Sequence, residues 1–229
     1  VQGVDDSGNI IYTNNGSWYA ALGADYIDYA YRFADETGYD NVKLRYNDFS
    51  ENVDNKREAM IKMLKGLRER GLRVDIMGMQ SHYGSHTTAS SVRRALQDFL
   101  GMGINVDITE IDLNAYTYIQ STEKKQLYEK GLPKEVEFTQ ATLYAELFKL
   151  YREYAEYIDR VNFWSFQDNF AYANRDASFA RTEYCGIFDR NYQAKPQYWA
   201  IIDPDKYYSE ILNEDTSVTR LIVNSVQTE

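Results

Sequence analysis

The chain has 229 residues, of which 44% are hydrophobic, and this is enough to build a sizeable core in one large domain or two small ones. Its 35 acidic and 25 basic residues give a formal net charge of −10, which disfavours nucleic acid and anionic membranes as partners. No apolar run approaches the roughly 20 residues that span a bilayer, and the amino end does not resemble a signal peptide. The single cysteine, Cys185, excludes an internal disulfide and a cysteine-based zinc site.

Helix and strand patterns alternate along the chain after an opening loop that is rich in Gly, Asp and Asn. The first predicted helix runs from Ser17, a candidate N-cap, to about Thr37, and Gly38 is its predicted stop. The elements predicted after it are the strand VKLRYNDF, a helix over residues 55–70, the strand VDIMGMQSHY, a helix over 90–102, the strand INVDITEIDL, a helix over 137–157, the strand RVNFWSFQD and a short helix over 196–202.

This alternation predicts a parallel sheet covered by helices, because each strand is a near-continuous apolar run. A doubly wound sheet and a barrel both satisfy the pattern. Polar residues gather at the carboxyl ends of the strands, and these residues are Asn47, Asp48, Gln80, His82, Glu110, Asp112, Gln167 and Asp168. In an eight-stranded α/β barrel this end carries the active site, so the four strands favour half of such a barrel.

Two long irregular segments and a tail complete the chain. Residues 116–133 form a polar loop that is too long for a simple connection, and we interpret it as part of a cleft wall or lid. Residues 169–189 are predicted to form a second irregular loop. The tail over residues 204–229 could add a strand at RLIVNSV, and nothing in its sequence indicates a function.

The carboxylates at the end of VDITEID have a structural and a catalytic interpretation. Glu110 alone is equally well explained as a solvated strand-end carboxylate. His82 ends the preceding strand, however, and a parallel sheet would bring it beside Glu110 and Asp112. Hydrolysis of a glycosidic bond needs rigidly placed carboxylates, and a hydrogen bond from His82 would keep Glu110 ionised and oriented.

Other chemistries have weaker support in the sequence. His82, His86, Glu110 and Asp112 have ligand types that suit zinc or iron, but their spacing matches no familiar metal-binding motif. Cys185 would need a histidine partner to act as a nucleophile, and the chain has only two histidines. Nucleotide binding lacks a glycine-rich phosphate loop, which also counts against a doubly wound domain that acts on phosphorylated small molecules.

Aromatic residues are abundant, with 21 Tyr, 10 Phe and 3 Trp. Such rings occur in protein cores, and they also stack on sugars or contact proteins at surfaces. Four lie in or just after the last predicted strand, and they are either core residues or flat faces for pyranose rings at the mouth of a barrel: Trp164, Phe166, Phe170 and Tyr172.

Five segments in this order resemble those of the family 10 glycoside hydrolases, the endo-β-1,4-xylanases: LRYNDF, MGMQSHY, ITEID, NFWSFQD and GIFDRNYQAKPQYWAI. The resemblance extends from about Ser17 to Asp203. It implies an eight-stranded α/β barrel, the TIM barrel, that hydrolyses xylan or xylo-oligosaccharides with retention of configuration. It also implies that residues 1–229 are the carboxyl-terminal half of one barrel domain, strands five to eight, with residues 1–16 as the loop after strand four. The expected partner is the amino-terminal half, and no metal or other cofactor is expected.

The resemblance also assigns roles to individual residues. It implies that Glu110 is the nucleophile, that His82 orients it and that Asp112 supports His82. Gln80 and Trp164 match positions that line the sugar subsite next to the scissile bond. Two further matches are Asn47, the family's strand asparagine, and Phe49, which stands where a tyrosine usually contacts the leaving-group side.

The sequence departs from the family pattern at two places. Tyr172 stands where the family usually has a second tryptophan, so the stacking face near the cleavage point is smaller. The family's acid/base glutamate is expected immediately before Val1, and we therefore expect the isolated chain to be inactive without its first barrel half. A non-catalytic sugar-binding protein is the alternative, although binding alone does not need an oriented nucleophile. Because polymeric xylan cannot enter a cell, the resemblance implies an extracellular or periplasmic protein.

Overall fold

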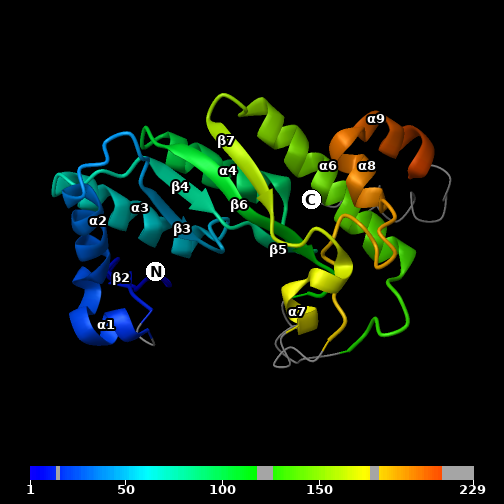
Figure 1. Ribbon diagram of the computed structural model, residues 1–229, viewed down its shortest axis with the longest axis horizontal. Coiled ribbons are helices and arrows are strands. Elements are labelled where there is room, and N and C mark those ends of the chain that lie inside the picture. The colour runs from blue at the N-terminus through cyan, green and yellow to red at the C-terminus, as the bar shows by residue number, and fades with distance from the viewer. Residues whose placement is uncertain (14–15, 118–125, 176–180, 213–229) are drawn as a thin grey trace. The chain divides into compact units, whose positions relative to one another are not determined.

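The computed structural model of the chain describes residues 1–13, 16–117, 126–175 and 181–212 (Figure 1). The chain divides into two compact units. The first unit comprises residues 1–81, 90–109 and 156–161, and the second comprises residues 82–89, 110–155 and 162–229. Two strands, β6 (Asn105–Asn114) and β7 (Ile158–Phe163), pair with each other, and each contributes residues to both units.

Parallel strands form the centre of the first unit. The strand β3 (Arg45–Asp48) pairs in parallel with β4 (Ile76–Met79), and β4 pairs in parallel with the first half of β6. A separate antiparallel pair, β1 (Gly3–Val4) and β2 (Ile10–Ile11), precedes them. The predicted parallel sheet is confirmed, although β3 is four residues shorter than the predicted strand VKLRYNDF.

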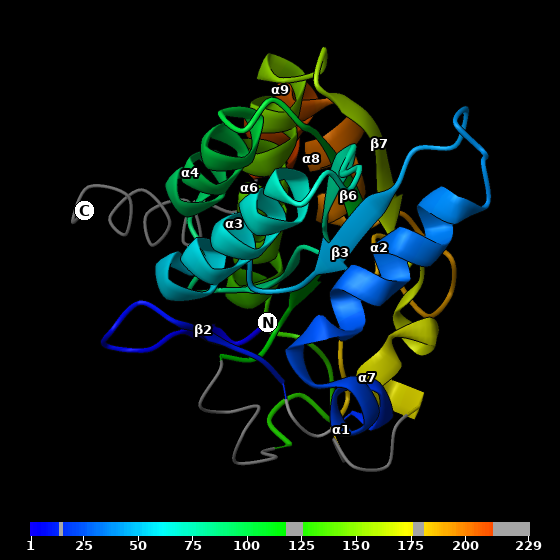
Figure 2. The same ribbon diagram turned by 90° about the vertical axis from the view of Figure 1, so that its left-hand side faces the viewer.

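Two helices cover one face of these strands. Helices α3 (Asp54–Glu69) and α4 (Ala89–Leu100) lie side by side in Figure 2. Their apolar residues recur at helical spacing, so each helix buries one stripe, and the stripes contribute Met60, Met63, Leu64, Leu67, Val92, Leu96 and Phe99 to the core. Burial of each such side chain stabilises the fold by about 1.5–3 kcal/mol relative to exposure.

The helix predicted over residues 17–37 is broken in the structure. It consists of α1 (Ser17–Leu22), a turn of 3₁₀ helix (η1, Gly23–Asp25) and α2 (Tyr26–Glu36). The break falls at Gly23, whose φ of 63° is incompatible with a continuing right-handed helix. Ser17 is the first helical residue and Gly16 the N-cap, so the predicted capping role of Ser17 is wrong.

Close packing and buried charge mark the middle of the sheet in the first unit. A Cβ atom on Gly78 would lie 2.6 Å from Asn47 Oδ1, so the neighbouring strand leaves room only for glycine. Next to Gly78 in the register, Asp107 is fully buried, and its carboxylate lies 2.7 Å from a guanidinium nitrogen of Arg45 and 3.5 Å from one of Arg160. A buried carboxylate needs such partners, because burial without them strongly disfavours the charged form.

The second unit begins with strand β5 (His82–Gly84). The sequence predicts one continuous strand, VDIMGMQSHY, where the structure has two strands, β4 and β5. Ser81 separates them with a φ of 60°, a conformation that interrupts a strand. After this break β5 pairs in parallel with the second half of β6, and His82 lies opposite Asp112 in the register.

Helix α6 (Lys134–Glu153) is the longest element of the second unit, with 20 residues. It follows Pro133, and Glu135 and Glu137 in its first turn favour a helix start by complementing the helix dipole. Helix α8 (Pro196–Ile202) lies against it in Figure 1, and α9 (Pro204–Lys206) packs against α8. The unit also contains the short elements η2 (Asp168–Phe170), α7 (Tyr172–Arg175) and the π-helical turn η3 (Tyr207–Ile211).

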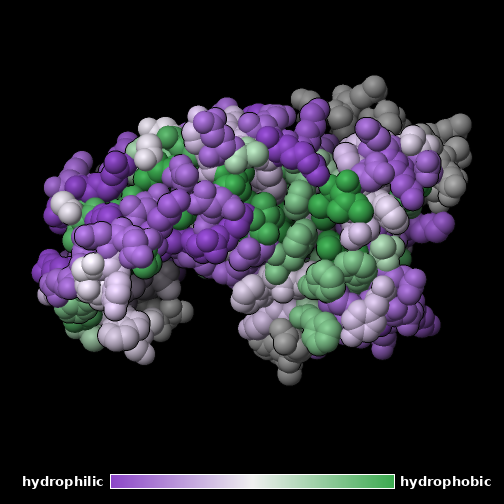
Figure 3. Space-filling model, turned by 45° about the horizontal axis from the view of Figure 1, so that its top comes forward, coloured by the Kyte–Doolittle hydropathy of each residue, from purple (hydrophilic) through white to green (hydrophobic). Residues whose placement is uncertain are grey.

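Several predictions fall on segments without a described structure. The strand predicted at RLIVNSV and parts of both long loops lie outside the described residues. No helix among the described residues is both long and apolar enough to cross a membrane. Figure 3 shows apolar residues on one face of the molecule. In the second unit, Phe166 and Phe170 are 58% and 52% exposed.

Candidate active site

Strand β6 carries three polar side chains on one face near its carboxyl end. Glu110, Asp112 and Asn114 are spaced by two residues, so the pleat of the strand points them to the same side. Apolar neighbours alternate with them, and Ile111 and Leu113 are fully buried on the other face. The strand therefore holds the three polar groups at fixed separations.

The imidazole of His82 bridges the two carboxylates. Its Nδ1 lies 2.7 Å from Asp112 Oδ1, and its Nε2 lies 3.3 Å from Glu110 Oε2. All three side chains are partly or largely buried, with exposed fractions of 29% for His82, 17% for Glu110 and 8% for Asp112. The structure thus brings together the three residues that the sequence places at neighbouring strand ends.

The two carboxylates control the charge of His82. Burial lowers its pKa, but the hydrogen bond to Asp112 and the negative charges of Asp112 and Glu110 outweigh burial and raise the pKa above the ordinary value of 6.5. The protonated ring has an N–H on both nitrogens and donates to both carboxylates at once. In this protonated form Glu110 faces a hydrogen-bond donor on His82 Nε2.

A hollow of about 320 Å³ opens beside this set. Its lining residues belong to the second unit and are His82, Asp112, Asn114, Trp164, Tyr172, Arg181 and Cys185. Trp164 follows β7 directly, and its backbone N–H donates to the carbonyl of Ile111 at 3.1 Å. The indole is 51% exposed and meets the His82 ring edge to face, with 6.0 Å between ring centroids. Trp164 is thus an exposed face at the hollow and not a core residue.

Three residues that line the hollow, Asn114, Arg181 and Cys185, were not predicted from the sequence as part of the site. Asn114 continues the face of Glu110 and Asp112, so strand periodicity alone would have indicated it. Its amide nitrogen donates to the carbonyl of Tyr83 at 3.3 Å, and its oxygen lies 3.4 Å from Arg181 Nη2 and 3.7 Å from Cys185 Sγ. Arg181 and Cys185 come from an irregular loop, where no periodicity indicates which side chains point inward.

A buried ion pair fixes this loop. Arg181 Nε lies 3.1 Å from Glu183 Oε2, and their side chains are only 4% and 0% exposed. Glu183 also accepts the backbone N–H groups of Ala115 at 2.8 Å and Tyr184 at 3.1 Å. The Arg181 guanidinium lies 4.9 Å from the ring centroid of Tyr116. The pair therefore ties the segment after β6 to the loop that lines the hollow.

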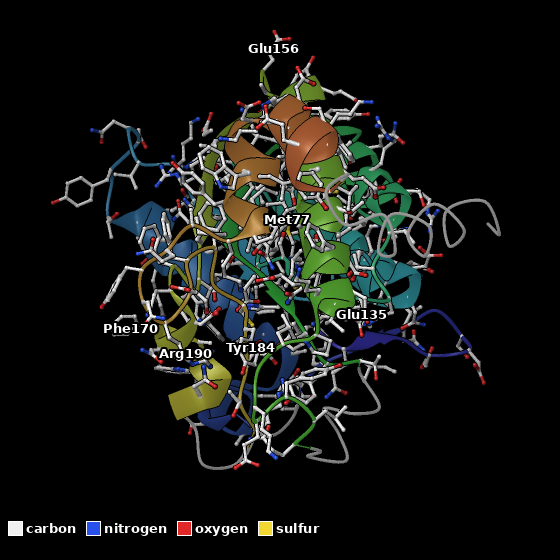
Figure 4. All side chains as sticks on the ribbon, turned by 90° about the vertical axis from the view of Figure 1, so that its right-hand side faces the viewer. Met77, Glu135, Glu156, Phe170, Tyr184 and Arg190 are labelled. Atoms are coloured by element: carbon white, nitrogen blue, oxygen red, sulfur yellow. The ribbon has the colours of Figure 1, made fainter. Side chains whose placement is uncertain are left out.

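A second buried pair anchors the turn that leads from Trp164 to Tyr172. Lys195 Nζ lies 3.1 Å from Asp168 Oδ1 and donates to the carbonyls of Tyr184 at 3.1 Å and Gly186 at 2.8 Å. Figure 4 shows Arg190 beside Tyr184, with its guanidinium 4.3 Å from the ring centroid. These buried contacts stabilise the turn between Trp164 and Tyr172, the two aromatic residues that line the hollow.

Three predicted substrate-binding residues belong to the first unit, and the hollow in the second unit does not include them. Asn47 Oδ1 accepts a hydrogen bond from the Thr109 hydroxyl at 2.6 Å. Phe49 is 53% exposed, and the ammonium of Lys56 lies 3.3 Å from its ring centroid. The backbone N–H of Gln80 donates to the carbonyl of Asp48 at 3.0 Å. Their proposed contacts with substrate stay predictions.

The arrangement favours carboxylate chemistry over the alternatives. Burial, with the nearby charges of Glu183 and Asp112, raises the pKa of Cys185 well above its ordinary value, so its thiol stays protonated and weakly nucleophilic. Among the described residues, no group of three or more His, Cys, Asp and Glu is arranged to hold a metal ion. An oriented carboxylate beside an aromatic face suits attack on a sugar.

Comparison with known proteins identifies a family. Residues 3–204 match the model of the family described as Glycosyl hydrolase family 10. The chain is 34% identical over 190 residues to an endo-1,4-beta-xylanase A of Thermotoga neapolitana, covering 82% of this chain and 17% of that protein. It is 31% identical over 193 residues to a thermostable celloxylanase of Thermoclostridium stercorarium, covering 84% of this chain and 49% of that protein.

Solved structures show the same likeness. The chain superimposes on xylanase B from Clostridium stercorarium F9 with a TM-score of 0.78 and 29% identity, over 89% of this chain and 58% of that one. It superimposes on xylanase XynB from Paenibacillus barcinonensis with a TM-score of 0.76 and 28% identity, over 88% and 59%. The chain thus spans half or less of these two curated relatives and about three fifths of these solved structures.

Proposed function

The chain belongs to glycosyl hydrolase family 10, and on that premise we propose that it carries the nucleophilic side of an endo-1,4-β-xylanase active site. The family and its solved members have a (β/α)₈ barrel, and this chain has the parallel strands of such a sheet. We assign the chain to strands five to eight of one barrel domain, with residues 1–16 as the loop after strand four. The order of its strands and strand-end residues supports this assignment.

The proposed reaction is hydrolysis of β-1,4-xylosidic bonds with retention of configuration. Glu110 attacks the anomeric carbon and displaces the leaving oxygen, which gives a covalent glycosyl-enzyme that water then hydrolyses. His82 donates a hydrogen bond to Glu110 and keeps it turned toward the sugar. Asp112 holds the other side of the imidazole. The observation that carries the proposal is the position of His82 between Asp112 at 2.7 Å and Glu110 at 3.3 Å.

A second carboxyl group must protonate the leaving oxygen and later activate water. Retaining enzymes place this group about 5–5.5 Å from the nucleophile. Asp112 is held by His82, and we do not assign the role to it. By resemblance to the family, we propose that the acid/base is a glutamate directly before Val1, contributed with the amino-terminal half of the barrel.

Substrate binding is proposed to use aromatic faces and amides. Trp164 and Tyr172 offer ring faces at the hollow, 51% and 50% exposed, on which pyranose rings can stack. Gln80, Asn47 and Phe49 are proposed to contact neighbouring sugar units because they match family positions. A solved relative in complex with xylotriose supports short xylo-oligosaccharides as ligands. No metal or cofactor is required by this chemistry.

The alternative is a protein that binds xylan or its oligosaccharides without cleaving them, or an inactive fragment of an enzyme. A binder would need the ring faces but would gain nothing from a histidine held between two carboxylates. The location proposed from the substrate is extracellular or periplasmic, because a polymer must be cut outside the cell. One solved relative is described as an intracellular xylanase of Thermoanaerobacterium saccharolyticum, so location varies in the family.

The proposal is tested by release of reducing sugar from β-1,4-xylan by the intact protein that contains this chain. Glu110→Gln keeps the size of the side chain and removes the nucleophile, so we expect the activity to be lost. The matched control is Glu69→Gln, at an exposed position in the last turn of α3, which should keep full activity. Retained activity in Glu110→Gln would refute the assignment, and oligosaccharide binding without cleavage by the parent protein would support the alternative.

A further inference from the structure

A second hollow, of about 330 Å³, lies in the first unit and shares no residue with the hollow beside His82. It lies between the residue after β2, the start of α2 and the end of α3. Its size is within the range of about 300–1,000 Å³ that is usual for small-ligand pockets. The residues that concern us are Tyr12, Asp25, Asp28, Tyr29, Arg32 and Arg70.

Tyrosine rings form the apolar part of this hollow, and neighbouring rings hold both in place. Tyr12 stacks on Tyr19 with 6.2 Å between centroids and an interplanar angle of 29°. Tyr29 stacks on Phe33 at 5.9 Å and 27°. The guanidinium of Arg32 lies 5.5 Å from the Tyr29 ring centroid. Because the rings are fixed in the free protein, little side-chain freedom is lost when a ligand stacks on them.

The polar part of the hollow is a rigid fork. Arg70 Nε lies 2.5 Å from Asp28 Oδ1, and Arg70 Nη2 lies 2.9 Å from Asp28 Oδ2. This two-pronged geometry fixes both side chains, while Arg70 stays 53% exposed and Asp28 19% exposed. The fork therefore presents donors and acceptors in set directions to anything that enters the hollow.

The charges of the lining residues balance. Asp25 and Asp28 oppose Arg32 and Arg70, so the hollow has no excess of either sign. A phosphate or a divalent cation would favour an excess of positive or negative charge, respectively. A neutral ligand with many hydroxyl groups fits better, because carboxylates accept hydrogen bonds from hydroxyls and guanidinium groups donate to them. Flat ring faces complete the set of contacts that a sugar uses.

We propose that this hollow is a second, non-catalytic binding site for a β-1,4-linked xylose chain. The identity of the sugar rests on the proposed xylanase function, whereas the site itself rests on the rings and the fork. Burial and the charge of Asp28 raise the pKa of the Tyr12 phenol, so its hydroxyl stays protonated and can donate to a sugar oxygen. A polymer held here stays near the enzyme between cleavage events, so the site lowers KM for long chains and not for short ones.

The test compares polymer and short substrates in the intact protein. In a Glu110→Gln background, which prevents cleavage, Tyr29→Ala should weaken retention in gels that contain soluble xylan by about two- to twelvefold in Kd. In the active protein, the same change should raise KM for xylan and leave kcat/KM for a short aryl xylobioside unchanged. Tyr29→Phe keeps the ring and should keep retention near the parent value. The control is Tyr39→Ala, because Tyr39 is 67% exposed and does not line the hollow.

A second variant, Arg70→Gln, removes the fork and leaves both rings, and it should also weaken retention. Parental retention in both Tyr29→Ala and Arg70→Gln would overturn the proposal. If the protein hydrolyses xylan and neither its retention nor its KM for xylan changes in Tyr29→Ala, this site is refuted and the proposed function still stands. Retention that depends on Tyr29 in a protein that cleaves no xylan would support the site and refute the proposed function.

Discussion

Replacement of Asp112 by Asn tests how the His82 bridge works. The change keeps the shape of the side chain and a hydrogen-bond acceptor but removes the negative charge that lies 2.7 Å from His82 Nδ1. Removing it lowers the pKa of His82, which Asp112 and Glu110 together raise above 6.5. The His82 ring then loses the proton on Nε2, which faces Glu110, at a lower pH than in the parent protein.

The magnitude follows from the kind of hydrogen bond. A hydrogen bond to a charged group contributes about 1.5–3 kcal/mol, and a neutral one about 0.5–1.5 kcal/mol. Asp112→Asn exchanges the first for the second, a loss of roughly 1–1.5 kcal/mol. If the bond is felt fully in the transition state, kcat/KM falls by about five- to twelvefold. Asp112→Ala removes the acceptor as well, and we expect a fall of about 12- to 150-fold.

The sign of the pH effect also follows. A histidine whose pKa is raised on folding stabilises the fold fully below its unfolded value, and the stabilisation is lost as the pH rises through the folded pKa. For His82 this loss begins above 6.5. In Asp112→Asn, both the alkaline fall in activity and the loss of stability should therefore move to lower pH.

The assay is the initial rate of xylan hydrolysis between acid and alkaline pH, with unfolding by urea measured in parallel. The matched control is Asp107→Asn, on the same strand, where Asp107 is buried against Arg45 at 2.7 Å and does not line the hollow at His82. It should lower stability without moving the alkaline limb of activity. An unchanged rate and an unchanged alkaline limb in Asp112→Asn would refute the proposed bridge.

Three further predictions follow from the contacts described. Lys195→Met leaves Asp168 buried without its ammonium partner, so the free energy of unfolding in urea should fall by about 3–5 kcal/mol. The control, Lys43→Met, breaks an exposed pair with Asp159 and should change the free energy of unfolding by no more than about 1 kcal/mol. Equal effects of the two changes would contradict the role of burial. Trp164→Ala should raise KM for xylotriose more than it lowers kcat, with Trp164→Phe in between, whereas an unchanged KM would exclude the ring as a sugar platform. If the chain is half a barrel, as we propose, residues 1–229 expressed alone would have two uncovered parallel edge strands. They should then unfold without a cooperative transition and release no sugar from xylan, and a cooperatively unfolding monomer would contradict this.

Local patterns predicted the frame of the molecule well. Apolar spacing identified α3 and α8 almost to the residue, and runs of apolar residues identified β4 and β6. Strand periodicity and the parallel order were sufficient to place His82 beside Glu110 and Asp112. The end of each strand can be located from the local sequence, because it lies where the apolar run stops. Neighbouring parallel strands end at the same edge of the sheet, so the residues at these ends lie close together.

Features set by single backbone conformations were not predictable in this way. Helix periodicity continues through Gly23, yet the positive φ of this residue divides the helix. The strand predicted at β4 extends past Ser81 to Tyr83, yet the positive φ of Ser81 interrupts it before β5. The hollow at His82 also depends on Arg181 and Cys185, whose positions follow from the buried Arg181–Glu183 pair. Tertiary contacts fix these features, and the sequence around them has no periodicity that reports those contacts.

Trapping of the covalent intermediate shows whether Glu110 forms a bond to the sugar. The intact protein would be incubated with a 2-deoxy-2-fluoro xylobioside that carries a good leaving group, digested and analysed by mass spectrometry. We expect one modified peptide, with the mass of the fluorinated disaccharide attached at Glu110, and no modification in Glu110→Gln. A label on another carboxylate, or rapid turnover of xylan with inversion of configuration and no label, would contradict it.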